Sequence, residues 1–118
     1  MRPEPFMMKL NTDLTAGAVW SRFCQHFVGE ANRLTCSSYS FEFRGHLAEI
    51  LKNPIYDPEL MKSDPDPELF YPIEIDFSPL ADGLTREQQQ VLAKELADWS
   101  RTFASEVDVF GEYTDEFL

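Results

Sequence analysis

The sequence has few of the residues from which most metal, disulfide and nucleotide sites are built. Its 118 residues include two cysteines, two histidines and five glycines. Two cysteines cannot form a disulfide framework, so we expect a fold held by a hydrophobic core, with both thiols reduced. No stretch approaches the roughly 18 consecutive apolar residues of a membrane-spanning helix, and residues 1–9 lack the apolar segment of a signal peptide. These absences predict a soluble, cytoplasmic protein.

The short motifs of common catalytic and cofactor sites are also missing. The chain has no glycine-rich nucleotide loop, no HExxH or GxSxG sequence and no EF-hand calcium loop. Its thiol and imidazole groups lie in one short stretch, but without the paired spacing of zinc ligands: Cys24, His26, Cys36 and His46. We therefore predict a protein that is not an enzyme and that binds no metal or cofactor.

Basic residues are scarce as well. The chain has ten Lys and Arg residues and 21 Asp and Glu residues, which gives a formal net charge of −11. Residues 1–52 are nearly neutral, whereas residues 53–118 carry sixteen acidic and four basic side chains. A surface this acidic repels phosphate and anionic lipid, which argues against direct binding of nucleic acid or membranes. The complementary partner is a basic protein surface.

The chain has the length and composition of a single compact domain, residues 1–118. A hydrophobic fraction of 43% and an aromatic fraction of 14% are sufficient for a core. Four prolines mark residues 53–68 as a Pro- and Asp-rich loop. Residues 109–118 form an acidic, aromatic tail.

Three helices are predicted, over residues 13–32, 38–52 and 85–107. In the first, Val19, Phe23 and Phe27 recur at helical spacing. The second is ambiguous, because its aromatic residues at 39, 41 and 43 also alternate as in a strand. Its length and the following Asn-Pro sequence favour the helix.

The third helix has the clearest signals. Thr85 and Gln88 match the capping-box pattern at a helix start. The apolar side chains that follow are expected to form one buried face: Leu92, Leu96, Trp99, Phe103 and Val107.

Two short strands are predicted, around residues 6–10 and 70–77. In the second, apolar residues alternate with Glu74 and Asp76, which we expect on a solvated face, and Pro72 restricts it to an edge or a short strand. The predicted fold class is therefore mainly α with a short β element (α+β).

The acidic half contains the predicted partner-binding residues. If residues 64–68 are extended, carboxylates on alternate residues lie about 6 Å apart, close to the spacing of every second phosphate along a DNA strand. Proline would limit the entropy lost on binding, and neighbouring tyrosines would serve as anchors. The predicted site comprises Tyr56, Asp57, Glu59, Asp64, Asp66, Glu68, Tyr71, Glu74, Asp76, Glu112, Asp115 and Glu116.

In size and charge the chain resembles phage and mobile-element anti-defence proteins, including anti-CRISPR proteins and DNA mimics. The resemblance is one of class, and no family motif accompanies it. The leading hypothesis is an inhibitor that occludes the basic, nucleic-acid-binding surface of another protein. Two alternatives remain open. One is an immunity protein or antitoxin that neutralises a basic toxin such as a nuclease, and the other is a small accessory subunit of a larger assembly.

Overall fold

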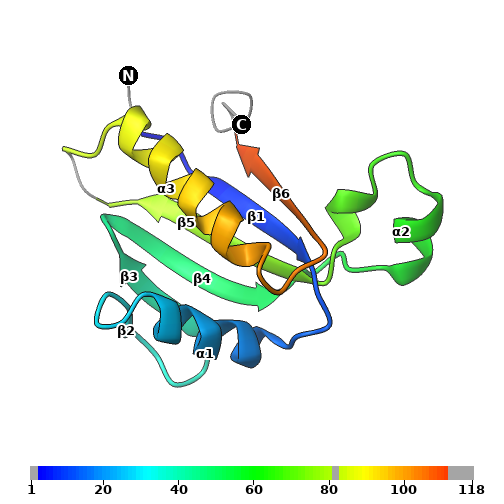
Figure 1. Cartoon of the computed structure of the whole chain (residues 1–118), viewed down its shortest axis with the longest axis horizontal. Coiled ribbons are helices and arrows are strands. Elements are labelled where there is room, and N and C mark those ends of the chain that lie inside the picture. Colours follow the sequence, from blue (N-terminus) through cyan, green and yellow to red (C-terminus); the bar gives the residue numbers. More distant parts are fainter. Residues whose placement is uncertain (1–2, 81–82, 112–118) are drawn as a thin grey trace.

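In the computed structural model, which describes residues 3–80 and 83–111, an antiparallel sheet carries two helices on one of its faces (Figure 1). Six strands are found in these residues, in the spatial order β2-β3-β4-β5-β1-β6. The strands are β1 (Phe6–Asn11), β2 (Asn32–Arg33), β3 (Tyr39–Phe43), β4 (His46–Lys52), β5 (Ile73–Pro79) and β6 (Glu106–Gly111). The helices are α1 (Ala16–His26), α2 (Pro58–Ser63) and α3 (Arg86–Ser100), with a 3-10 turn, η1 (Pro67–Phe70).

The prediction of a mainly helical fold is wrong, chiefly because residues 38–52 form the hairpin of β3 and β4. Arg44 and Gly45 connect the two strands with φ values of 44° and 80°. Positive φ at both central residues is the geometry of the tight turns that match the twist of a hairpin. The alternation of aromatic residues in β3 was thus the correct signal, and in β4 the side chain of Leu47 is 40% exposed.

The other two predicted helices exist but are shorter. The first begins after Thr15, whose hydroxyl accepts a hydrogen bond from the backbone of Ala18, and ends at His26 rather than 32. The capping box of Thr85 and Gln88 is confirmed. Helix α3 nevertheless ends at Ser100, and residues 106–111, which include part of the predicted tail, form β6 beside β1.

Both predicted strands are confirmed, but β5 is not an edge strand. Pro72 lies immediately before it, so the missing N–H costs no ladder bond, and β5 pairs with both β4 and β1. In the loop over residues 53–68, the Asp57 carboxylate caps α2. The predicted extended row of acids is wrong at its end, because η1 begins at Pro67.

A cluster of aromatic rings joins the helices to the sheet. Phe23 of α1 is fully buried, and its ring centroid lies 4.8 Å from that of Phe41 and 4.9 Å from that of Phe43. The ring of Trp99, on α3, meets Phe23 edge-on at 5.3 Å. Phe23 therefore contacts β3 and α3 at once, and rings arranged in this way stabilise a fold beyond the area they bury.

A buried polar network ties α3 to β4 and to the residues that precede β1. Gln89 is fully buried, and its amide nitrogen donates to the backbone oxygen of Glu4 at 2.8 Å. The same nitrogen lies 3.1 Å from Nε2 of His46, which is also fully buried. Burial lowers the pKa of His46, so its neutral ring accepts this hydrogen bond.

We expect Phe23→Ala to lower the free energy of unfolding by about 3–5 kcal/mol, because it leaves a cavity among the rings. Val91→Ala is the control: Val91 is 68% exposed on α3, and its loss should change stability by less than about 0.5 kcal/mol. Urea denaturation followed by tryptophan fluorescence measures both. Equal effects would contradict the central role of the cluster.

Candidate functional site

Strand alternation divides the sheet into two chemically different faces. Phe6, Met8 and Leu10 of β1 point into the core beneath α1 and α3, so Met7 and Lys9 point to the other side. The registers with β5 and β6 extend this pattern across the sheet. We call the side away from α1 and α3 the open face. Its charged side chains, within the described residues, are Lys9, Glu42, Glu49, Glu74, Asp76, Glu106 and Asp108.

Residues 53–72, which we call the acidic arm, leave the sheet between β4 and β5 and contain α2 and η1 (Figure 1). The base of the arm is closed by Asn53, whose side-chain amide donates to the backbone oxygens of Leu69 at 2.9 Å and Tyr71 at 2.8 Å. Lys9 also donates to Leu69, at 2.9 Å. These bonds fix the arm against the open face.

Tyr71 stands where the arm meets the open face. Its hydroxyl donates a hydrogen bond to the carboxylate of Glu106 on β6. Burial, followed by this hydrogen bond, raises the pKa of Tyr71, and the nearby carboxylates of Glu68 and Asp108 add to the effect. Glu68 at the base of the arm and the two acids of β6 therefore act on the same side chain.

The centre of the open face holds a partly buried group of charges. Nζ of Lys9 lies 3.6 Å from Oε1 of Glu74, and both residues are buried. Burial, a hydrogen bond with Glu74 and repulsion from Glu74 and Glu49 raise the pKa of Asp76 to about 7. Asp76 is therefore partly protonated at neutral pH. Among the described residues, the buried Oδ1 of Asp76 has no hydrogen-bond partner.

Glu74 and Asp76 were predicted to lie on a solvated face, but Glu74 is buried and Asp76 is half-buried. Glu74 is 8% exposed, because Lys9 of the neighbouring strand lies in register with it and η1 packs against β1. Sequence reasoning missed Lys9 because its partner is distant in the chain. The available signal was the alternation of β1, which places Lys9 opposite the buried side of Met8 and Leu10.

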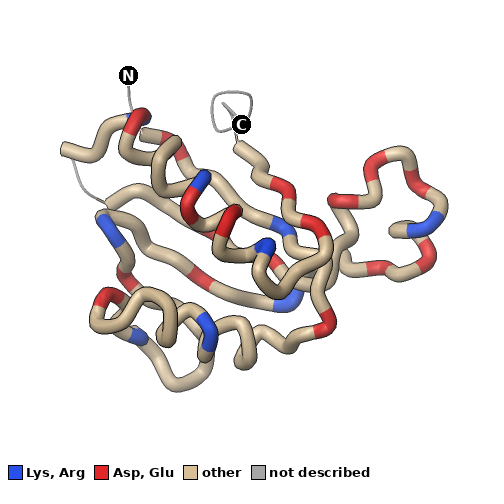
Figure 2. Tube along the Cα trace, viewed as in Figure 1, with Lys and Arg blue, Asp and Glu red and all other residues tan. Residues whose placement is uncertain are grey.

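The two layers of the molecule differ in charge. In the described residues, the helices with their flanking turns hold five carboxylates and five basic groups: Asp13, Glu30, Glu87, Glu95 and Asp98 against Arg22, Arg44, Arg86, Lys94 and Arg101. The acidic arm holds five carboxylates and one lysine, Lys62 (Figure 2). The open face adds six carboxylates and Lys9. Among the described residues, with Glu4, Arg33 and Lys52 outside these three groups, the charge excess therefore lies on the open face and the arm.

Most predicted site residues lie on this surface, but their roles differ. Glu59 and Asp66 are exposed on the arm, whereas the carboxylates of Asp57 and Asp64 accept local backbone hydrogen bonds. Tyr71 is 4% exposed, so its ring is not available as an anchor. The residues that the prediction missed are Glu42, Glu49, Glu106 and Asp108 on the sheet, and Ile55 and Leu60 as exposed apolar groups on the arm.

The remaining predicted residues are Tyr56, Glu68 and the acids after residue 111. Tyr56 is 37% exposed, with Nζ of Lys52 5.7 Å from its ring centroid, and Glu68 lies in η1. Glu112, Asp115 and Glu116 lie outside the described residues.

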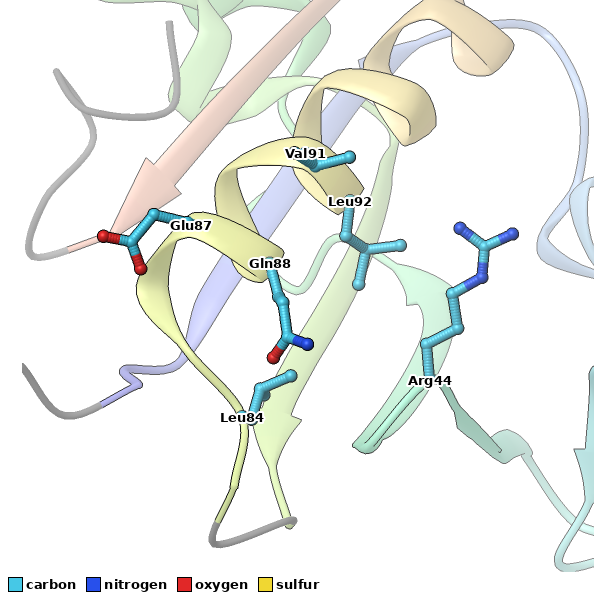
Figure 3. Close-up of a pocket in the computed structure, with 6 residues that line it drawn as sticks. All are labelled: Arg44, Leu84, Glu87, Gln88, Val91 and Leu92. Carbon is cyan, nitrogen blue, oxygen red and sulfur yellow. The ribbon is translucent and has the colours of Figure 1, made fainter.

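A cavity of about 410 Å³ lies on the helical side between α3 and the β3–β4 turn (Figure 3). Leu84, Val91 and Leu92 give it a mostly apolar lining, with Arg44 on the opposite side. The Arg44 guanidinium is already paired, at 2.9 Å with Glu30 and 2.6 Å with Glu95. The cavity therefore offers a ligand little unsatisfied charge.

No group of three or more His, Cys, Asp or Glu side chains in residues 3–80 and 83–111 is arranged to hold a metal ion. The helices within these ranges are too short or too polar to cross a membrane. Comparisons with protein-family models, curated proteins and solved structures find no match for the chain.

We expect Asp76→Asn to stabilise the protein more at pH 8 than at pH 5. The folded-state pKa of Asp76, about 7, lies above the ordinary value of 3.8, so its contribution to stability is full below pH 3.8 and is lost as the pH rises through 7. Asparagine cannot ionise, so the variant is spared this loss of stability. The stabilisation at pH 8 should exceed that at pH 5 by about 1–2 kcal/mol, reduced from the full shift by partial solvent exposure.

Urea denaturation of both proteins at the two pH values provides the measurement. The effect of His46 cancels, since it is present in both proteins. Glu42→Gln, an exposed change on the same face, should show a pH difference below about 0.5 kcal/mol. An Asp76→Asn protein with the same gain at both pH values would contradict a raised pKa of Asp76 in the folded protein.

Proposed function

We propose that the protein is an acidic inhibitor that occupies a basic, nucleic-acid-binding surface of another protein. The observation that carries the proposal is the separation of charge between the layers. A charge excess that served only solubility would be expected on both layers. A binding surface instead requires its charge on one side.

Both surfaces of the proposed site combine charge with apolar groups. Ile55 and Leu60 on the arm are 51% and 38% exposed, and Leu47 on the open face is 40% exposed. In protein complexes, charged groups increase the association rate and select the partner, while a few desolvated apolar groups provide much of the affinity. The carboxylates would direct a basic surface to the site, and these side chains would anchor it.

The structure changes how the proposed inhibitor would imitate a nucleic acid. Because η1 interrupts the extended row, the acids of the arm do not follow a single phosphate strand. They join the acids of the sheet in a two-dimensional field, through the contacts of Tyr71 and Lys9. Such a field matches a broad Lys- and Arg-rich groove better than a narrow channel for one strand.

A blocked defence nuclease and a neutralised toxin nuclease would present the same basic groove. The proposal therefore covers both the anti-defence and the immunity role. The identity of the captured protein distinguishes them.

The test compares two variants of equal net charge. The arm variant carries Glu59→Gln, Asp66→Asn and Glu68→Gln; the control carries Asp13→Asn, Glu87→Gln and Asp98→Asn, on the helical side. Each protein is used to capture partners from lysate of the natural host. We expect the wild type and the control to capture a nucleic-acid-binding protein and to displace its nucleic acid, and the arm variant to do so at least about tenfold more weakly at 0.1 M salt, where charges act over about 10 Å.

Raising the salt to 1 M should weaken wild-type binding, because the screening length falls to about 3 Å. If both variants lose binding equally, the field has no preferred side and the proposal fails. A captured protein that retains its nucleic acid in the complex would also contradict it.

A further inference from the structure

A pocket of about 310 Å³ lies where β1, β5 and β6 run side by side. On the open face, its lining includes Met7, Asp76, Ser78 and Phe110. Cavities that hold small ligands measure roughly 300–1,000 Å³, so this one suits a single side chain or a small molecule. No residue of the acidic arm lines it, and the pocket is therefore a feature of the sheet itself.

Strand register arranges the lining in a row. Met7 of β1 lies opposite Asp76 of β5 on one side and opposite Phe110 of β6 on the other. Neighbouring strands lie about 4.8 Å apart, which places the carboxyl group and the aromatic ring about 10 Å from each other with Met7 between them. An apolar stretch that ends in an acid is complementary to a long basic side chain, whose stem is apolar and whose end is charged.

The charged groups around the pocket leave Asp76 without a cation. Lys9 is held by Glu74, 3.6 Å from its Nζ, and is therefore already paired. Glu49, in register with Asp76 on β4, accepts a hydrogen bond from Ser40 at 3.1 Å. Among the described residues, the buried Oδ1 of Asp76 has no hydrogen-bond partner. The raised pKa of Asp76 agrees with this, because an ionised carboxylate at this position is poorly compensated.

We propose that this pocket binds one arginine side chain of the partner, with the guanidinium against the carboxylate of Asp76 and the methylene stem over Met7 and Phe110. Arginine fits better than lysine, because a guanidinium is more weakly hydrated than an ammonium and offers a carboxylate two parallel donors. This inference rests on the proposed function, which supplies the basic partner.

Binding at this pocket is linked to the release of a proton. A guanidinium favours the ionised form of Asp76, so the proton of its carboxyl group passes to solvent when arginine binds. With a pKa of about 7, Asp76 is ionised in about a tenth of the molecules at pH 6 and about nine tenths at pH 8. The other charged groups that face it are Glu74, Glu49 and Lys9. His46 packs against the opposite side of the sheet, and burial lowers its pKa.

The test uses a blocked Gly-Arg-Gly peptide, with a peptide that carries neutral citrulline in place of arginine as control. Binding to the isotopically labelled protein is followed by amide chemical shifts at 0.15 M salt. We expect shifts at Met7, Asp76 and Phe110, and an affinity about five- to tenfold higher at pH 8 than at pH 6, because the competent fraction of the protein rises. Ordinary carboxylates are ionised at both pH values, so general attraction to the acidic surface gives no such increase.

Two variants of equal net charge locate the effect. Asp76→Asn should weaken binding of the arginine peptide at pH 8 by about tenfold or more and abolish the pH dependence, since it removes the acceptor. Asp13→Asn, an exposed change beside α1, should alter the affinity by less than about twofold. Phe110→Ala should weaken binding by about threefold while the pH dependence persists, because only the apolar contact with the stem is lost.

An affinity that is equal at pH 6 and pH 8 would overturn the inference. So would an equal loss in Asp76→Asn and Asp13→Asn, which would indicate attraction to the acidic surface as a whole. A blocked Gly-Lys-Gly peptide that binds as tightly would overturn the assignment to arginine. The proposed function is decided separately: the arm variant should bind the arginine peptide like the wild type, and its capture of a partner is compared with that of the helical control.

Discussion

Both long helices pack on the same face of the sheet, and this one-sided packing determines where the charges of the molecule can lie. The covered face must be apolar, and the ring cluster around Phe23 together with the alternating residues of β1, β4 and β5 fills it. Because side chains alternate in a strand, every second residue is then directed to the open face. Those positions carry the carboxylates of the sheet. The acidic surface is thus a consequence of the core pattern and of the residues placed between its members.

The open face is not uniformly solvated, because the charged side chains at its centre are buried. Lys9 and Glu74 are buried as a pair, and Asp76 retains a proton near neutral pH because a third charge there is too costly to desolvate. At the margins, by contrast, Glu42 and Glu106 are exposed. A basic partner would therefore meet strong, accessible charges at the rim and a partly neutralised centre.

Local signals in the sequence predicted local structure well. The capping residues Thr85 and Gln88 mark a helix start through hydrogen bonds to nearby backbone groups, which depend on few other parts of the chain. The alternation of apolar and acidic residues in β5 is likewise a local pattern, and it predicted a strand correctly. Residues 38–52 were misassigned because helical and strand patterns coexist there, and the pairing of β3 with β4 and of β4 with β5 decides between them. The acidity of the site was visible in the composition, but its location was not, since β6 and Lys9 reach the open face through long-range pairing.

Asn53 has a consequence for how the acidic arm can vary. Its amide bonds to Leu69 and Tyr71 close the two ends of the arm on each other, so the sheet receives the same pair of chain ends whatever lies between them. Residues 54–68 pass outside this closure and contribute no residue to the main core cluster. Lengthening a closed surface loop costs little, about 0.6 kcal/mol for each doubling. The arm can therefore change in length and charge without altering the strands to which it is attached.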